Sequence, residues 1–335
     1  MASIFQDKSI LVTGGTGSIG SEIVRKVLQY KPNVVRVFDN DEAELFNLEQ
    51  ELRNYPNVRF LVGNVRDKER LQRAVEGIDF LFHAAALKHV PLCEYNPFEA
   101  VKTNVLGTQN LIEAAMEEEV DKLITISTDK AVNPVNVMGA TKLLAERLTI
   151  SANHYKGARK TAFSCVRFGN VLDSRGSVVP LFQTQIEKGG PVTLTDSDMT
   201  RFVMSIPRAV YLVFTAAEIA QGGEIFVFKM PALRIGDLVE AMVEELAPQY
   251  GYNPESIKVE ISGRRAGEKI YEELLTADEA MNASETEDMF IITPAAKNQE
   301  RKMIAAKEYR SNRDGILLAK EEIKEILGGS SPQDL

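Results

Sequence analysis

Short apolar runs alternate with longer amphipathic stretches through the first half of the chain. The run at 10–12 is typical of a buried strand, and Ile19, Ile23 and Val27 then recur every four residues, on one face of a helix. We expect further strands at 34–38, 60–62, 80–82, 123–126 and 161–166, with helices between them that include 97–119 and 137–155. This alternation predicts an α/β fold, a doubly wound parallel sheet with helices on both faces.

The regular alternation ends near residue 170. Beyond that point Gly and Pro interrupt the chain at 189–191, 230–231 and 247–248, and the elements between them are short and mixed. We therefore predict two domains, the first over 1–170 and a smaller C-terminal α/β domain over 171–335. A segment near 205–230 is expected to return to the first domain.

Composition narrows the class of protein. The 335 residues are 44% hydrophobic and 26% charged, which suits a globular chain with a sizeable core. The net charge of −9 disfavours general binding to nucleic acid or to an anionic membrane, although a small anionic ligand needs only a local cationic pocket. No apolar run approaches ~18 residues and no secretory signal is recognisable, so we expect no membrane span and a cytoplasmic location.

Cysteine and histidine are scarce. The chain has two cysteines, Cys93 and Cys165, and three histidines, and none of them stands at metal-ligand spacing. We therefore predict neither a disulfide framework nor a metal site.

A glycine-rich loop follows the first predicted strand directly. It reads T-G-G-T-G-S-I-G over 13–20 and stands between a strand and a helix. Glycines at this spacing permit a tight turn and let backbone N–H groups at a helix N-terminus approach a pyrophosphate. The alternative is an ordinary glycine-rich turn. The position favours a Rossmann-type dinucleotide site, and its expected loop residues are Gly14, Thr16, Gly17, Ser18, Ile19 and Gly20.

Asp39 ends the second predicted strand, nineteen residues after Gly20. A carboxylate there can accept hydrogen bonds from the adenine ribose hydroxyls and would repel a 2′-phosphate, so NAD is favoured over NADP. The alternative is that Asp39 only favours the start of the next helix. Asn64 and Val65, after the third strand, are expected at the adenine edge.

A second polar stretch follows the fifth predicted strand. It reads S-T-D-K-A-V-N-P-V-N-V-M-G-A-T-K over 127–142. Ligands of open parallel sheets bind at the carboxyl ends of strands, and two adjacent titratable residues there, Asp129 and Lys130, suit acid/base chemistry. Lys142 on the following helix supplies a third. The alternative is a surface ion pair with a solvated Lys142.

These stretches resemble a known family. The glycine loop and the lysine at 142 are similar to those of the extended short-chain dehydrogenase/reductases. The 127–142 stretch, with H-A-A-A-L-K-H-V-P at 83–91, E-Y-N-P at 94–97 and R-F-G-N-V at 167–171, resembles the nucleotide-sugar 4,6-dehydratases of polysaccharide biosynthesis. The resemblance covers about residues 8–295. It implies an enzyme that uses NAD, acts on a UDP-sugar, usually UDP-N-acetylglucosamine, and forms a homo-oligomer.

The resemblance also implies an internal redox cycle. Hydride leaves the sugar C4, the ketone so formed acidifies the C5 proton, water is lost across C5 and C6, and the hydride returns to C6. Within this scheme we assign Asp129 as the acid toward the C6 hydroxyl and a neutral Lys130 as the base at C5. Lys142 is expected at the nicotinamide ribose, and Thr128 at the C4 hydroxyl.

Met138 stands where the superfamily has its tyrosine, four residues before Lys142 and on the same helix face. A thioether cannot take or give a proton at a useful pKa, so the tyrosine's task must pass to another group. The resemblance implies an active variant. The alternative is a cofactor-binding protein that has lost its chemistry.

Further site residues are expected from the resemblance alone. Lys88 should reach both cofactor and sugar, while Ala84 and Asn104 belong to the cofactor site. Paired N–H groups make arginine suited to a diphosphate. The expected substrate-binding residues are Lys88, Lys130, Asn170, Arg201, Arg265 and Glu268. Two other functions stay open: a UDP-sugar 4-epimerase, and a non-catalytic NAD-binding sensor or scaffold.

Overall fold

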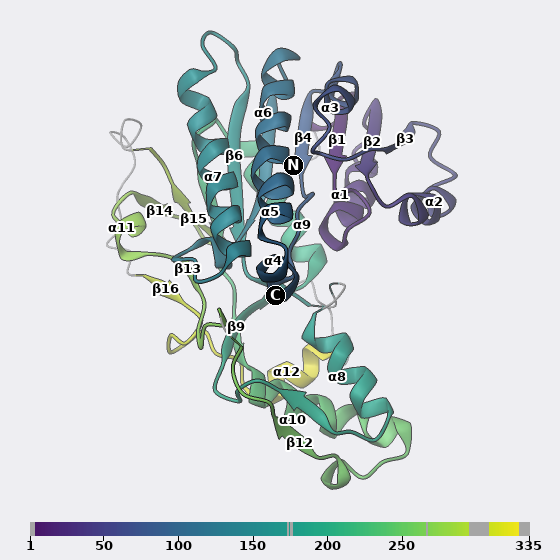
Figure 1. The fold of residues 1–335 in the computed structure, drawn as a ribbon, viewed down its shortest axis with the longest axis vertical. Coiled ribbons are helices and arrows are strands. Elements are labelled where there is room, and N and C mark those ends of the chain that lie inside the picture. The colour runs from purple at the N-terminus through teal and green to yellow at the C-terminus, as the bar shows by residue number, and fades with distance from the viewer. Residues whose placement is uncertain (1–3, 173, 175–176, 266, 295–307, 328–335) are drawn as a thin grey trace.

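A nine-stranded sheet forms the centre of the protein in the computed structural model (Figure 1). The structure describes residues 4–172, 174, 177–265, 267–294 and 308–327. In spatial order the strands are β14 (Ala283–Glu285), β15 (Met289–Ile292), β10 (Ile225–Phe228), β6 (Ala162–Phe168), β5 (Lys122–Thr128), β4 (Phe80–His83), β1 (Ser9–Thr13), β2 (Val34–Asp39) and β3 (Val58–Val62).

Neighbouring strands from β10 to β3 pair in parallel, whereas β15 and β14 are antiparallel. Side chains alternate between the two faces of the sheet. Along β1, Ile10 and Val12 join one apolar core and Leu11 joins the other. The predicted α/β fold with a doubly wound sheet is confirmed.

Helices cover both faces of this sheet. The first core takes in apolar residues of α1 (Ser18–Leu28), α2 (Glu42–Glu51) and α9 (Ile206–Ile219). The second core takes in residues of α3 (Lys68–Val75), α6 (Gly107–Glu117) and α7 (Val137–Tyr155). The short helices α4 (Val90–Tyr95) and α5 (Pro97–Ala100) lead into α6. None of the described helices has the length and apolar content needed to cross a bilayer.

The stretch predicted as one helix over 97–119 is not uniform. A π-helical segment, Val101–Leu106, separates α5 from α6. This segment carries Asn104, whose buried side chain bonds the backbone of Leu87 and the hydroxyl of Thr141. Wider π turns are often found at functional sites. Here the wider turn contains Asn104, whose side-chain amide links this segment to Leu87 and to Thr141 on α7.

Part of the second half of the chain returns to the large sheet. Helix α9 packs on α1, and β10 pairs with β6. Strands β15 and β14 extend the same sheet, which the sequence pattern did not indicate because both are short. The division into two domains near residue 170 stays our proposal.

The other strands form smaller sheets: β7 (Asn170–Val171), β9 (Thr200–Met204) and β11 (Ala232–Arg234); β8 (Val192–Leu194) and β12 (Val259–Ile261); β13 (Glu273–Leu275) and β16 (Tyr309–Arg310). A further apolar core joins β8 and β9 to α8 (Val178–Glu187), α10 (Ile235–Leu246) and α12 (Lys320–Leu327). Figure 1 shows these three helices gathered below the sheet, while α11 (Ala277–Ala280) lies beside β14.

Candidate active site

The glycine loop turns tightly between β1 and α1. Gly14 has a φ of +66°, and a Cβ built on it would lie 2.5 Å from the backbone N of Ala85. A Cβ on Gly20 would lie 2.0 Å from the Gly14 carbonyl oxygen. Only glycine fits these two positions, because the backbone is left-handed at one and blocked at both. Gly17 is the N-cap of α1, and Ser18 and Ile19 form its first turn, an arrangement suited to a phosphate.

Asp39, at the end of β2, contacts this loop directly. Its Oδ2 accepts hydrogen bonds from Thr16 N at 3.0 Å and from Thr16 Oγ1 at 2.7 Å. The next helix is capped by Asp41, whose side chain accepts from Glu44 N. Asp39 Oδ1 also accepts from Asn40 N at 2.8 Å and from Asp41 N at 3.2 Å, so this carboxylate also holds the residues that lead into α2. Its role toward the adenine ribose stays a prediction.

The other expected cofactor residues lie around the loop. The Ala84 N–H donates to the Thr13 carbonyl, so the Ala84–Ala85 peptide passes beside Gly14. Asn64 Oδ1 accepts from Arg66 N, and the Val65 side chain is buried in the core. Their places as cofactor contacts stay predictions.

Asn104 holds the segment that leads to Lys88. Its Oδ1 accepts from Leu87 N at 2.8 Å, and its Nδ2 donates to Leu87 O and to Thr141 Oγ1, each at 3.0 Å. The buried amide therefore links the 84–88 segment to α7. Lys88 itself lies in an exposed position next to this anchor.

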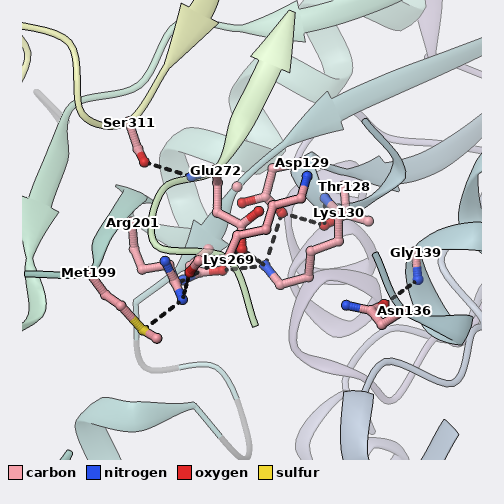
Figure 2. A network of polar contacts seen from close by, with 12 residues as sticks. Thr128, Asp129, Lys130, Asn136, Gly139, Met199, Arg201, Lys269, Glu272 and Ser311 are labelled. Carbon is pink, nitrogen blue, oxygen red and sulfur yellow. Dashed lines mark hydrogen bonds and ion pairs between the residues drawn. The ribbon is translucent and has the colours of Figure 1, made fainter. Parts of the chain in front are cut away.

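The catalytic candidates meet where β5 ends. Asp129 is fully buried and begins a single 3₁₀ turn directly after Thr128. Its Oδ1 accepts hydrogen bonds from Thr128 Oγ1 at 2.7 Å and from Lys130 Nζ at 3.0 Å (Figure 2). The same Nζ donates to Asn170 Oδ1 at 3.1 Å. A surface ion pair is excluded, and the structure brings Thr128, Asp129, Lys130 and Asn170 together.

Lys130 is charged in the free protein. Burial opposes its charge, but the carboxylates of Asp129 and Glu272 outweigh that penalty and raise the lysine pKa. The neutral Lys130 amine that we expect to act at C5 is therefore not the form of this lysine in the free protein. A base at this position has to lose a proton before it can act.

Met138 and Lys142 lie one turn apart on α7. Met138 is 4% exposed and packs in a small apolar cluster with Cys93 and Ala100. Lys142 is also buried, and its Nζ donates to the carbonyl of Ile126 at 2.6 Å. Burial lowers the Lys142 pKa to about 8. The methionine therefore fills apolar space one helical turn from Lys142, a lysine whose pKa is lowered by burial.

The expected diphosphate residues are less closely grouped. Arg201 donates through Nη1 to the carbonyl of Thr200 and through Nη2 to the carbonyl of Lys269. Arg265 lies in an exposed turn, where its N–H donates to Glu268 Oε2 at 3.2 Å. In the described structure Arg201 therefore binds the backbone at Lys269, just after this turn. Roles of all three toward a diphosphate stay predictions.

Glu272 is the site residue that sequence reasoning missed. It is 3% exposed, and its Oε1 lies 3.8 Å from Lys130 Nζ. In the sequence it is one of two adjacent glutamates in Y-E-E-L-L, and no spacing connects it to residue 130. Only the packing of β13 against the turn that follows β5 could reveal it.

No group of three or more His, Cys, Asp or Glu side chains within the described ranges could hold a metal ion.

Comparison with known proteins places the chain among nucleotide-sugar enzymes. The family model described as "Polysaccharide biosynthesis protein" matches residues 10–294. A Campylobacter jejuni protein named UDP-N-acetylglucosamine 4,6-dehydratase (inverting) is 44% identical over 296 residues, covering 88% of this chain and 85% of that protein. A Methanocaldococcus jannaschii protein named as an uncharacterized membrane protein is 64% identical over 329 residues, covering 98% and 97%.

Solved structures share the fold. Pen from Bacillus thuringiensis has a TM-score of 0.92 and 47% identity, with 98% of this chain and 99% of that chain covered. A UDP-glucose 4-epimerase from Thermus thermophilus, solved in complex with NAD, has a TM-score of 0.63 and 25% identity, with 78% and 88% covered. The likeness to Pen extends over nearly the whole chain.

Proposed function

The chain belongs to the polysaccharide biosynthesis protein family, and we propose that it dehydrates UDP-N-acetylglucosamine to UDP-4-keto-6-deoxy-N-acetylhexosamine with NAD as cofactor. It is a nucleotide-sugar 4,6-dehydratase of the extended short-chain dehydrogenase/reductase type. One observation carries the proposal. An acid/base pair, the buried Asp129 and the partly exposed Lys130, lies at the carboxyl end of β5, on the sheet edge where the glycine loop also turns.

The residues present fit a nicotinamide dinucleotide. Gly14 and Gly20 leave backbone room that any Cβ would fill, and the loop ends at the N-terminus of α1. The loop would hold the pyrophosphate, Asp39 the adenine ribose and Lys142 the nicotinamide ribose. We propose NAD rather than NADP because the Asp39 carboxylate would repel a 2′-phosphate. When bound, the cofactor accepts a hydride from C4 and returns it at C6.

The Asp129–Lys130 pair can perform the elimination by itself. Movement of one proton from Lys130 Nζ to Asp129 Oδ1, 3.0 Å away, converts the ion pair into a neutral amine and a carboxylic acid. The amine then takes the C5 proton, and the acid protonates the C6 hydroxyl, which departs as water. The ammonium would return this proton to C5 as the hydride arrives at C6, and the proton released from the C4 hydroxyl during its oxidation would restore the pair to ammonium and carboxylate.

Thr128 and Asn170 orient this pair. Thr128 Oγ1 donates to Asp129 Oδ1 and accepts from Lys130 N at 3.4 Å, which leaves one lone pair for the C4 hydroxyl of the sugar. Asn170 Oδ1 holds Lys130 Nζ at 3.1 Å, so the amine cannot swing away from the reacting carbon. Both contacts restrict the geometry before the substrate arrives.

A mass measurement tests the function. The protein is incubated with UDP-N-acetylglucosamine and NAD, and the nucleotide product is weighed by mass spectrometry. Loss of one water supports the dehydratase. A product of unchanged mass but different mobility would select a 4-epimerase, and no turnover would select a cofactor-binding sensor.

The 4-epimerase is the second candidate because a solved UDP-glucose 4-epimerase shares this fold. Such an enzyme returns the hydride to C4 and has no proton to remove from C5. The Asp129–Lys130 pair would then lack a task. The dehydratase accounts for it.

Oligomer formation and cellular location complete the proposal. Phe98, Leu106 and Leu144 are about half exposed or more and lie on α5, the π-helical segment and α7, which supports pairing through these helices. Light scattering tests for the homo-oligomer.

Cys93 and Cys165 are buried free thiols, which supports our proposal of a cytoplasmic enzyme.

A further inference from the structure

Glu272 is a buried carboxylate that faces the acid/base pair and takes no part in the mechanism above. It directly precedes β13, and its Oε1 lies 3.8 Å from Lys130 Nζ and 3.9 Å from Arg201 Nε. Its Oε2 has no hydrogen-bond partner within the described part of the chain, and neither has Asp129 Oδ2. An unpartnered buried carboxylate oxygen lowers the stability of the folded protein, so its presence here points to a role in function.

The backbone of Glu272 is held firmly. Its N–H donates to Ser311 Oγ at 2.9 Å, and its carbonyl accepts from Ser311 N at 2.9 Å. Ser311 is fully buried and donates in turn to the carbonyl of Thr200. Figure 2 shows Glu272 between Ser311 and Lys130. The carboxylate is therefore presented to the lysine from a fixed anchor.

Lys130 needs such support. A lysine side chain has a flexible four-carbon stem, and its partner Asp129 adjoins it in the chain and constrains it from one side only. Asn170 supplies a second contact from β7, and Glu272 supplies a third from the segment before β13. A small cavity lined by Lys130, Val135, Asn136, Gly267, Lys269 and Glu272 lies beside this cluster.

We propose that Glu272 is a positioning residue for the catalytic base: it holds the Lys130 amine from the C-terminal half of the chain and sets how tightly that amine keeps its proton. The proposal rests on the dehydratase function. It adds a third group to the acid/base pair, and it makes the base depend on a segment far away in the sequence.

The charges around Glu272 agree with this role. Burial raises the Glu272 pKa and Asp129 raises it further, while Lys130, Arg201 and Lys269 oppose that shift. Glu272 and Asp129 in turn raise the Lys130 pKa, against burial and Arg201. The lysine therefore holds its proton less tightly when Glu272 is neutral.

The neighbouring glutamate provides a matched control. Glu273 is also buried, but it accepts from Arg310 Nε at 2.7 Å and from Asn133 Nδ2 at 2.9 Å, away from Lys130. Glu272→Gln and Glu273→Gln remove the same charge from adjacent positions. Only the first removes it beside the lysine.

The test measures the Lys130 pKa by competitive acetylation of the intact protein across pH, with the Lys130 peptide quantified by mass spectrometry. In Glu272→Gln the Lys130 pKa should fall, the falling limb of the kcat–pH profile should move to lower pH because the pair must keep the lysine proton to react, and kcat should drop on the order of 10- to 100-fold with little change in KM. Glu273→Gln should leave both pH profiles in place. Glu272→Asp, which keeps the charge, should restore part of the lysine pKa.

The proposal is overturned if Lys130 titrates alike in the parent and in Glu272→Gln, or if Glu273→Gln causes the same shift. Should Glu272→Gln fail to fold, Glu272→Asp and Ser311→Ala take its place in the test of the Lys130 pKa. Both variants move the Glu272 carboxylate away from Lys130 without removing its charge. If the parent protein eliminates no water from UDP-N-acetylglucosamine, the proposed function fails on its own, and the acetylation profile still decides whether Glu272 sets the lysine pKa.

Discussion

Lys130 Nζ lies 3.0 Å from Asp129 Oδ1, in a pair whose carboxylate is fully buried while the lysine side chain is 24% exposed. The acid is thus enclosed, and the lysine is partly exposed. This asymmetry suits a pair in which the acid keeps its proton away from bulk water and the amine meets the carbon to be deprotonated.

Asp129→Asn should abolish product formation and leave NAD binding within about threefold of the parent, because the change keeps the shape of the side chain and removes only its proton chemistry. Lys130→Ala should also abolish turnover. It should cost more stability, roughly 3–5 kcal/mol, since it leaves a buried carboxylate without its cation. Product mass and NAD titration measure these effects. If both variants lose NAD binding, the pair is structural.

Met138→Leu should keep turnover within about twofold, because a thioether moves no proton and a swap of equal volume costs less than ~1.5 kcal/mol. Met138→Tyr should lower the thermal stability, since Cys93 and Ala100 close the cluster around this side chain. Steady-state rates and melting curves of the two variants provide the comparison. A large rate gain in Met138→Tyr would contradict this view and show that the missing phenol limits turnover.

His83 should carry its proton on Nε2 and stay neutral well below its usual pKa. Thr108 Oγ1 spends its hydrogen on the carbonyl of Asn104 and so must accept from His83 Nε2, while Thr13 Oγ1 donates to Nδ1. Burial, assisted by the charge of Lys142, lowers the His83 pKa to about 3. Nitrogen NMR of the imidazole measures the tautomer directly. A protonated ring at pH 5 would refute the prediction.

The same shift has a consequence for stability. Between pH 6.5 and about 3 the unfolded chain binds a proton at His83 that the folded chain does not. The contribution of His83 to stability is therefore complete above pH 6.5 and declines as the solution is acidified. The free energy of unfolding of the parent should fall relative to that of His83→Gln across this window. Parallel curves for the two proteins would show that the histidine titrates normally.

Asp39→Asn should weaken NAD binding roughly tenfold and reduce the preference for NAD over NADP, because it removes both a charged acceptor and the repulsion of a 2′-phosphate. Asp41→Ala is the matched control. It removes the cap of α2 at a cost of about 1 kcal/mol and should leave the cofactor preference unchanged. Titration with each dinucleotide gives the ratio. An equal change of preference in both variants would assign the effect to the helix rather than to Asp39.

Local patterns predicted what depends on neighbours along the chain. The glycines at 14, 17 and 20 and the carboxylate at 39 belong to one β-α-β unit, so their spacing alone places them at one edge of the sheet. Asp129 and Lys130 were predictable for the same reason, because they directly follow a strand whose end lies at that edge. The segment near 205–230 was also expected to return to the first domain, and in the structure α9 packs on α1 and β10 pairs with β6.

Other features had no local signal. The helix expected over 97–119 contains a π-helical segment, and Asn104 within it bonds Leu87 and Thr141, two residues outside that helix. Strands β14 and β15 were missed since each is short and is held by its pairing within the sheet. Pairing and side-chain bonds of this kind become visible only when distant segments meet.

The sequence by itself determined the parallel sheet, the glycine loop and the position of the proposed acid/base pair after β5, since apolar periodicity and glycine spacing act through neighbouring residues. Tertiary structure alone decided how firmly Lys130 keeps its proton. Burial opposes the charge of the lysine, but folding places Asp129 beside it and brings Glu272 within 3.8 Å, which together raise its pKa, and a pKa depends on distance and burial in space rather than on position along the chain.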